Sequence, residues 1–548
     1  MGSTVFIILL SILVITLIVS TIVHEKNARA GRLKDLCDSF GEAGNRIFDE
    51  NVPADKPALY EHLRSINKDD FCIDDITEHD LGIHDVFARM NRCVTNAGED
   101  YLFCALHMLS YDSDKTADIY DSIYEHTKHP DQSRGLLCIL DGLRKNRGED
   151  RFSLIEKCTH KKNVSIIWDI TGILLLAASV ILIGFIPIAG LVATIVMIMV
   201  MIGTYFSEKR EIDDCLNGLS YSLRMIRCAY QLSNNGCDDF DRYKDLIRLC
   251  RWNFLISFKD ESTSDPLSLI FDYVRMIFHT DLIACKLKLS GIADHAGMIR
   301  DLYTDIGKLD ACLAVASYIM GRAHCKAAKG NDRIIAKGIY HPLIDDPVRN
   351  DIDISRGMLL TGSNASGKST FLKAMGLNVI FAKSFGFALA DSFSCPVSKL
   401  YTSMALSDNL LGAESYYVVE AKSIKRICDA GEGVLCIIDE VLRGTNTIER
   451  IAASYRILSS FCRPGMFCFA ATHDLELTYL LDDDMDLYHF TEEINVDNVT
   501  FPYLLKEGRS DKTNALSLLS MLGFDSNITE SAKMVVDGYK KTGSWSKL

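Results

Sequence analysis

The chain has 548 residues, enough for several domains and a large hydrophobic core. Its formal net charge of −14 argues against a protein whose main activity is coating duplex DNA, because such proteins are usually basic. Hydrophobic residues make up 48% of the sequence and the mean hydropathy is +0.09, which is high for a soluble protein and directs attention to membrane segments.

The first predicted element is a membrane-spanning helix near the start of the chain. Residues 4–23 form a run of twenty residues without a charged side chain, long enough to cross a bilayer. A cleaved signal peptide is the alternative, since Ala28–Ala30 resembles a cleavage site, but no basic residue precedes the run and it is long for such a segment. Basic residues from Lys26 to Lys34 follow it, so the positive-inside rule places the downstream chain in the cytoplasm.

A second apolar stretch, residues 164–206, predicts a hairpin of two membrane helices. It is too long for one span, and the sequence Gly-Phe-Ile-Pro at 184–187 offers a tight reversal, so we expect helices over about 164–184 and 188–206. Basic residues flank both ends of the stretch and place both ends in the cytoplasm. A buried hairpin in a soluble protein is the alternative. The resulting prediction is a three-span protein of the inner membrane.

The segments around this hairpin, 25–163 and 207–330, have apolar residues at helical spacing and are predicted to be helical. The chain is therefore expected to contain an anchor (1–24), a helical region (25–163), a hairpin (164–206), a second helical region (207–330) and a nucleotide-binding domain (331–548). The 18 cysteines include no C-x-x-C pair, so we expect free thiols in a reducing compartment, with neither zinc nor a disulfide framework.

Residues 362–370 form a complete phosphate-binding loop between a short apolar strand and a predicted helix. The glycines allow backbone N–H groups to turn toward phosphate oxygens. Lys368 is expected to reach the β- and γ-phosphates and Ser369 to ligate Mg²⁺, so ATP and Mg²⁺ are the predicted cofactors. The predicted nucleotide-binding residues of the loop are Gly362, Ser363, Asn364, Ala365, Ser366, Gly367, Lys368, Ser369 and Thr370.

Two further apolar runs end in polar residues and predict the rest of the nucleotide site. The run 433–440 is expected to be a buried parallel strand that delivers Asp439 and Glu440 to the edge of the sheet where ligands bind. Asp439 would hold Mg²⁺, and Glu440 would orient and deprotonate the attacking water. The run 466–473 would bring His473 to the same edge, where it could sense the γ-phosphate.

Together these motifs resemble the MutS family of DNA mismatch-repair ATPases. The phosphate loop, including Asn364, resembles that of the family, and residues 439–447 resemble its Walker B segment. Residues 471–473 match its switch histidine, 415–420 are similar to its signature segment, and His341-Pro342 resembles the opening of its ATPase domain. A weaker resemblance links residues 85–99 to the start of the family's helical core. The fold class implied is an α/β P-loop ATPase domain following a helical core, here with transmembrane helices.

The resemblance implies a homodimer with two composite ATP sites. One subunit would supply Lys368, Ser369, Asp439, Glu440 and His473, and the other would offer Ser415 to the γ-phosphate. No segment leaves room for the family's mismatch-reading domain, so a role in mismatch repair itself does not follow. Two functions are expected: an ATPase that moves or clamps DNA at the membrane, or an ATP-gated membrane switch with a protein or envelope partner. An ABC-type transporter is a third, weaker reading, because the spans carry no polar pattern of a translocation path.

Overall fold

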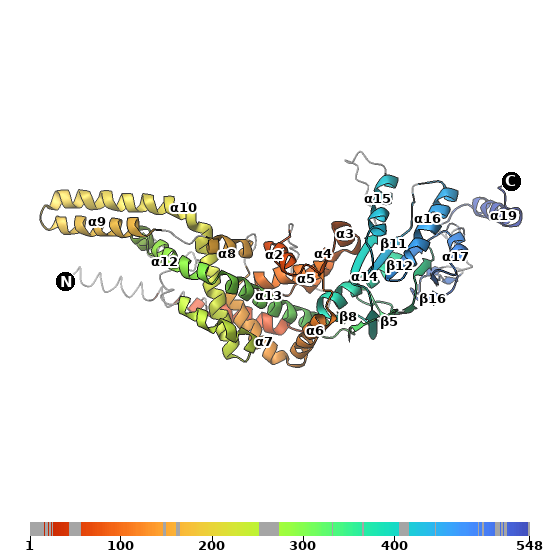
Figure 1. Ribbon diagram of the computed structural model, residues 1–548, viewed down its shortest axis with the longest axis horizontal. Helices are drawn as coiled ribbons and strands as arrows, with labels where there is room; N and C mark the ends of the chain where they lie inside the picture. The colour runs from red at the N-terminus through yellow and green to blue at the C-terminus, as the bar shows by residue number, and fades with distance from the viewer. Residues whose placement is uncertain are drawn as a thin grey trace.

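The computed structural model describes residues 16, 20, 23–24, 26–42, 56–145, 150–160, 165–250, 273–330, 332–363, 366–404, 416–443, 445–491, 493–495, 498–509, 516, 519 and 523–545. Three parts follow one another along its long axis (Figure 1). Two long helices project at one end, a helical region occupies the middle, and an α/β domain forms the other end. The predicted membrane helix 4–23 lies almost entirely outside the described residues.

The middle region combines helices from both sides of the projecting pair. They are α2 (Ala58–Ile66), α3 (Asp75–Leu81), α4 (Ile83–Met90), α5 (Asn96–His107), α6 (Ser113–Lys128), α7 (Pro130–Leu140), α8 (Arg151–His160), α12 (Thr280–Asp294) and α13 (Ala296–Ile319), with short 3₁₀ segments at Asp141–Leu143 and Asp238–Cys250. Helix α13 is central, because α4, α5, α6, α7 and α8 all contact it. The chain before and after the hairpin therefore folds as one unit.

A buried carboxylate joins α13 to the start of α5. Asp310 is fully buried and accepts hydrogen bonds from the backbone N–H groups of Val94 and Thr95 and from the Thr95 hydroxyl, at 2.6–3.2 Å. Thr95 caps α5 in turn, since its hydroxyl accepts from the Gly98 N–H. A side chain at Gly98 would collide with Asp310, so this glycine permits the close approach of the two helices.

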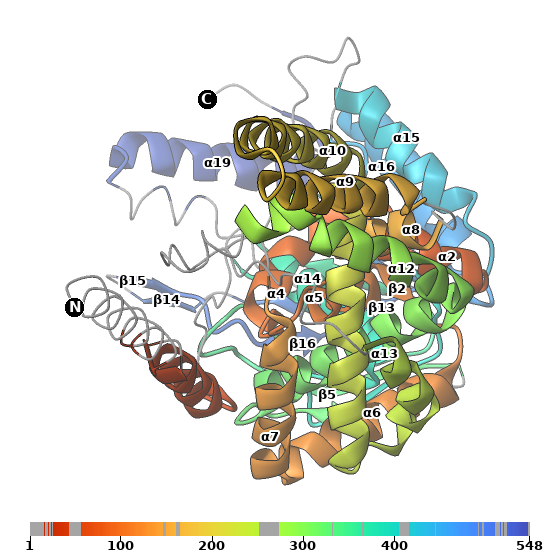
Figure 2. The same ribbon diagram turned by 90° about the vertical axis from the view of Figure 1, so that its left-hand side faces the viewer.

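The projecting pair consists of α9 (Ile167–Ile183) and α10 (Pro187–Asn234), which reverse at Gly184–Ile186 as the sequence predicts. Figure 2 looks along this pair and shows the two helices side by side. The predicted end of the second helix at 206 is wrong: α10 is 48 residues long and continues to Asn234 in the middle region, because its apolar stretch passes directly into an amphipathic helix. Among the described residues, one helix segment, Pro187–Arg210, is long and apolar enough to cross a membrane by length and composition, while the apolar α9 is shorter. The three predicted spans are therefore not established.

The α/β domain is organised around a six-stranded sheet of order β10-β11-β12-β7-β13-β16, in which only β16 runs antiparallel to its neighbour. Its strands are β7 (Met358–Thr361), β10 (Lys399–Ser403), β11 (Val434–Asp439), β12 (Met466–Thr472), β13 (Asp486–Phe490) and β16 (Leu505–Glu507). A smaller sheet packs nearby, formed by β4 (Ala328–Lys329), β9 (Ser392–Cys395), β5 (Ile334–Ile339) and β6 (Asn350–Ile354). Short two-stranded pairs are β1 (Phe71–Cys72) with β2 (Met108–Leu109), β3 (Cys325–Lys326) with β8 (Phe387–Ala388), and β14 (Glu493–Asn495) with β15 (Asn498–Thr500).

Helices cover both faces of the large sheet, which explains why its central strands are uninterrupted apolar runs. The helices of this domain are α14 (Lys368–Phe385), α15 (Tyr416–Cys428), α16 (Thr447–Phe461), α17 (Glu476–Leu480) and α19 (Ser526–Thr542). Along β11, Leu435 and Ile437 face the core that contains α14, whereas the alternating residues face the core that contains α15 and α16. Because successive side chains of a strand point to opposite faces of the sheet, the apolar residues of β11 contribute to two different cores.

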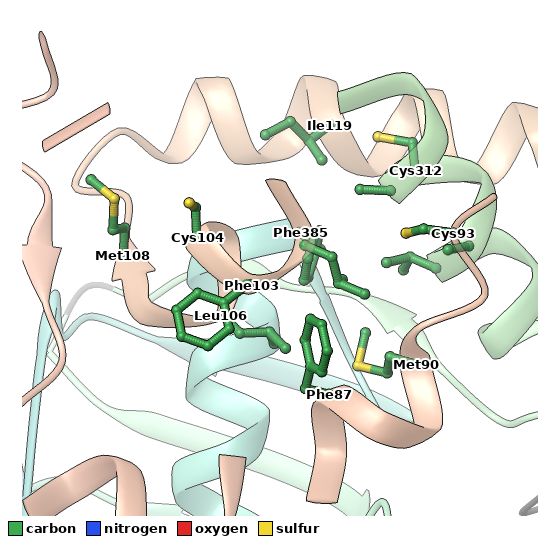
Figure 3. Packing of buried hydrophobic residues seen from close by; sticks show 14 of the residues in the cluster. Phe87, Met90, Cys93, Phe103, Cys104, Leu106, Met108, Ile119, Cys312 and Phe385 are labelled. Carbon is green, nitrogen blue, oxygen red and sulfur yellow. The ribbon is translucent and has the colours of Figure 1, made fainter. Parts of the chain in front are cut away.

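One continuous core crosses from the helical middle into the α/β domain. Phe385, near the end of α14, lies among Phe87 of α4 and Phe103 of α5, as Figure 3 shows. A polar contact reinforces this joint, since the buried Asp80 of α3 accepts hydrogen bonds from the Thr402 hydroxyl (2.7 Å) and the Met404 N–H (2.9 Å) beside β10. A movement of the α/β domain is therefore mechanically connected to α3, α4 and α5.

Candidate nucleotide site

The phosphate loop connects β7, in the centre of the large sheet, to the start of α14. Gly362 (φ 147°) and Gly367 (φ 101°) both have positive φ, and a Cβ at Gly362 would lie 2.7 Å from the Ser366 hydroxyl. The Ser366 hydroxyl donates to the Ser363 carbonyl at 2.8 Å and closes the loop. Asn364 and Ala365 lie outside the described residues. Thr370 is exposed one residue after Ser369 in the first turn of α14, so the loop leads directly to a helix N-terminus, which favours anions.

Lys368 is the first residue of α14 and its side chain lies back over the loop. The Nζ atom donates to the carbonyl oxygens of Gly362 and Ser363, both at 2.7 Å, and lies 3.5 Å from Nε2 of His473. Its ammonium group is buried with these partners. The sequence predicts that Lys368 and His473 share one site, and the structure places them together across 105 residues of chain.

The predicted magnesium ligands also meet. The Ser369 hydroxyl, in the first turn of α14, donates to Oδ2 of Asp439 at 2.5 Å, although the two residues are 70 positions apart. Asp439 is the last residue of β11, two strands away from β7 in the sheet. A hydroxyl and a carboxylate are the oxygen donors that Mg²⁺ takes beside substrate phosphates, so the pair fits this ion.

Glu440 occupies a constrained position directly after β11. Its φ of 65° is unusual for a residue with a side chain, and its N–H donates to the Ala471 carbonyl on β12 at 3.0 Å. Oε1 lies 3.0 Å from Nε2 of His473, and Oε2 lies 3.0 Å from Nε of Arg443. The hydrogen bond from His473 is the largest influence on the pKa of Glu440 and lowers it; burial acts to raise the pKa, and the charges of Arg443 and Lys368 add to the lowering. Glu440 is therefore a carboxylate at neutral pH, as a general base requires.

Arg443 connects the end of β11 to α15. Its guanidinium donates to the Asp439 carbonyl at 2.6 Å, and its N–H donates to Oε1 of Glu420 at 3.3 Å. Glu420 is buried on α15, and burial raises the pKa of its carboxyl. The motif spacing does not indicate this link, because Glu420 becomes a neighbour only through the packing of α15. Ser415, predicted to act across a dimer interface, lies outside the described residues.

A cavity of about 500 Å³ opens beside Lys368 and Ser369. Its walls include the aromatic rings of Phe371, Phe490 and Tyr503, together with His341. Burial lowers the pKa of His341 to about 4, with help from the charges of Lys373 and Arg89, so its imidazole is neutral at pH 7. An aromatic cavity next to a phosphate loop suits a nucleoside base. Sequence reasoning missed Phe490 and Tyr503, because neither lies in a motif and both are more than 100 residues from the loop.

These groups can perform the parts of phosphoryl transfer to water. The loop and the ammonium of Lys368 neutralise phosphate charge, Ser369 and Asp439 suit a magnesium ion, and the Glu440 carboxylate suits a base that orients water. All of them lie at the carboxyl edge of the parallel strands, where open α/β sheets bind ligands.

Comparisons with known proteins agree with this geometry. Residues 358–540 match the family model described as MutS domain V. The chain is similar to the DNA mismatch repair protein MutS of Pseudothermotoga lettingae (26% identity, 45% of this chain, 32% of the relative) and of Thermosipho melanesiensis (29%, 46%, 32%). It is also similar to MutS protein homolog 4 of Mus musculus (30%, 44%, 27%). The chain thus spans about a third of the length of the curated relatives it matches.

Proposed function

The chain belongs to the MutS family through its α/β domain, and from this premise we propose that it is a membrane-anchored ATPase whose subunits pair to complete two ATP sites. The observation that carries the ATPase proposal is the convergence of Lys368, the Ser369–Asp439 pair and the Glu440–His473 pair at one sheet edge. ATP binding would draw two such edges together, with Ser415 of each subunit reaching the γ-phosphate of the other. Hydrolysis would release them.

The membrane part of the proposal is supported by the exposed apolar surface of α9 and α10. Trp168, Phe185 and Ile188 are each at least 78% exposed, and most of the Pro187–Arg210 segment is likewise uncovered. An apolar surface of this extent normally lies against a membrane or another protein. In this proposal the hairpin enters the inner membrane and the α/β domain lies in the cytoplasm.

The hairpin is joined to the rest of the molecule by a buried ionic cluster, which favours a second function. Lys286 of α12 bridges Asp169 at the base of α9 (2.7 Å) and Glu208 of α10 (2.5 Å). His279 lies 2.8 Å from the other Asp169 oxygen, and the Tyr205 hydroxyl donates to Asp281 at 2.8 Å. Because α10 continues unbroken into the middle region, a change at the nucleotide site has a rigid route to the hairpin.

Two outputs are therefore proposed for ATP binding. The first is the clamping or movement of DNA at the membrane, favoured by the similarity of the chain to proteins that are named for DNA mismatch repair. The second is an ATP-gated membrane switch that acts on a protein or envelope partner, favoured by the α10 connection and by the net charge of −14. Binding of the full chain to duplex DNA across a salt series separates them, because phosphate contacts weaken steeply as salt rises. Absence of salt-sensitive binding excludes the first output.

The ATPase proposal is tested with the full chain purified in detergent. Wild-type protein should bind ATP and form a dimer on addition of ATP with Mg²⁺, measured by light scattering. Lys368→Ala should abolish both, while Lys425→Ala, which removes an exposed lysine on α15, should change neither. Equal ATP binding by wild type and Lys368→Ala would refute the assignment of the site.

A further inference from the structure

Away from the nucleotide site, three potential metal ligands meet where α3, α4 and α5 join. Oε1 of Glu78 lies 2.5 Å from Nε2 of His84 and 3.3 Å from Nε2 of His107. All three atoms lie within 4.8 Å of one another. The residues come from α3, the first turn of α4 and the last residue of α5, so three separate helices aim one donor each at a common point.

The orientation of His107 directs its buried Nε2 atom toward this point. Its Nδ1 lies 2.7 Å from the Phe103 carbonyl, which can only accept, so Nδ1 carries the hydrogen. The Phe103 ring stacks on the imidazole at 4.0 Å between centroids and holds the ring in place. In the neutral ring Nε2 is then a bare lone pair, and within the part of the chain that the structure describes this atom makes no hydrogen bond, although the side chain is 1% exposed.

A lone pair that faces a carboxylate oxygen is unfavourable unless a positive charge lies between them. A metal-bound histidine commonly donates its other ring N–H to a carbonyl or carboxylate, which is the arrangement of His107. The cluster therefore presents two imidazole nitrogens and one carboxylate oxygen to a common point, with the His107 tautomer that a bound cation requires.

We propose that Glu78, His84 and His107 bind a divalent transition-metal ion, best matched by Zn²⁺, at the joint of α3, α4 and α5. Two imidazoles and one carboxylate form a known three-residue zinc set with an open fourth position, and Fe²⁺ uses the same donors. Tetrahedral bonds of about 2.1 Å place neighbouring donors roughly 3.4 Å apart. The distance of 3.3 Å between the Glu78 oxygen and Nε2 of His107 matches this spacing. The distance of 2.5 Å between the same oxygen and Nε2 of His84 is ~1 Å too short, but His84 is 47% exposed at the start of α4 and can move outward by that amount.

The position of this site gives it a structural consequence. Asp80, two residues after Glu78 on α3, accepts the hydrogen bonds that attach α3 to β10 and the segment after it. A bound ion would fix α3 relative to α4 and α5 and so fix the contact between the helical middle and the α/β domain. The expectation that no zinc binds came from the spacing of the cysteines, all of which are free thiols in the structure, and this proposal departs from it.

The test uses the full chain, purified without chelators, and compares wild type with His84→Ala and with the matched control His79→Ala. His79 is exposed on the same helix as Glu78 but lies outside the cluster. Elemental analysis should find about one metal ion per wild-type chain and should identify it as zinc or iron. After removal of metal, competition with a chromogenic chelator should give a Zn²⁺ affinity more than about 100-fold weaker for His84→Ala, since loss of a ligand exceeds the 10–100-fold effect of losing an outer partner.

A thermal readout distinguishes a metal site from an ion pair. Zn²⁺ should raise the melting temperature of wild type and His79→Ala but not of His84→Ala, because only a folded-state site stabilises the fold by binding. Co²⁺ should give visible absorption bands in wild type that His84→Ala lacks. Wild-type protein that retains no metal, and a Zn²⁺ affinity that is equal in wild type and His84→Ala, would overturn the proposal and assign the cluster to an ion pair with protonated histidine.

Discussion

The substitution Glu440→Gln tests the proposed chemistry most directly. Gln keeps the size of the side chain but loses the negative charge that lies 3.0 Å from both His473 and Arg443. Removal of a general base lowers turnover by about 10²–10⁴-fold, which corresponds to roughly 3–5 kcal/mol in the activation barrier. The phosphate loop and the Ser369–Asp439 pair remain, so ATP should still bind. The variant is therefore expected to stop the cycle after ATP binding and before hydrolysis.

The assay measures both ATP hydrolysis and the ATP-dependent dimer, with the full chain. Steady-state phosphate release should fall by the factor above, and light scattering should find a dimer that persists in ATP and Mg²⁺ instead of dissociating. Glu449→Gln is the matched control, because it removes an exposed carboxylate in the first turn of α16, outside the site. Turnover by Glu440→Gln equal to that of wild type and of the control would refute the role of Glu440 as the base.

Three further predictions follow from the packing around the site. Thr402→Val keeps the side-chain shape but removes a hydrogen bond to the buried Asp80 carboxylate, so denaturant unfolding should report a loss of about 2 kcal/mol. Tyr503→Ala removes a ring beside the phosphate loop and should weaken ATP binding about tenfold, while inorganic triphosphate, which has no base, should bind as before. His341 has a pKa lowered to about 4 from 6.5, so the unfolded state binds more protons as the pH falls through this range. Stability should fall over the same range, and His341→Gln should remove up to about 3 kcal/mol of that loss, measured by unfolding at pH 4 and pH 7.

The residues of the candidate nucleotide site could be predicted from local patterns. A phosphate loop needs its glycines, lysine and serine in immediate succession, because one turn of backbone holds the phosphates, so Lys368 and Ser369 are recognisable without any partner. Apolar runs that end at Asp439 and Thr472 likewise predict buried parallel strands, since both faces of such strands are covered. The hairpin reversal near 184–187 was also local, because Gly and Pro interrupt one long apolar run.

Contacts between distant segments could not be predicted in this way. Tyr503 and Phe490 reach the cavity only because β13 pairs with β7 and the following segment folds back over the loop. Helix α10 is unbroken because its C-terminal part packs against α8, α12 and α13. A hydropathy pattern carries no information about these contacts between helices. Glu78 and His107 are 29 residues apart, and no ligand spacing marks them as neighbours.

The sequence alone therefore determined the motifs whose residues are neighbours in the chain. The tertiary structure decided which residues from distant segments lie close together. The proposed phosphate-binding residues lie in a single turn of chain, whose geometry depends on its own glycines. The pairing of Ser369 with Asp439, of Glu440 with His473, and of Glu78 with His107 depends on which strands adjoin and which helices touch. Those arrangements result from the burial of apolar surface across the whole molecule. The free energy of this burial depends on many segments together and cannot be assigned to any one of them.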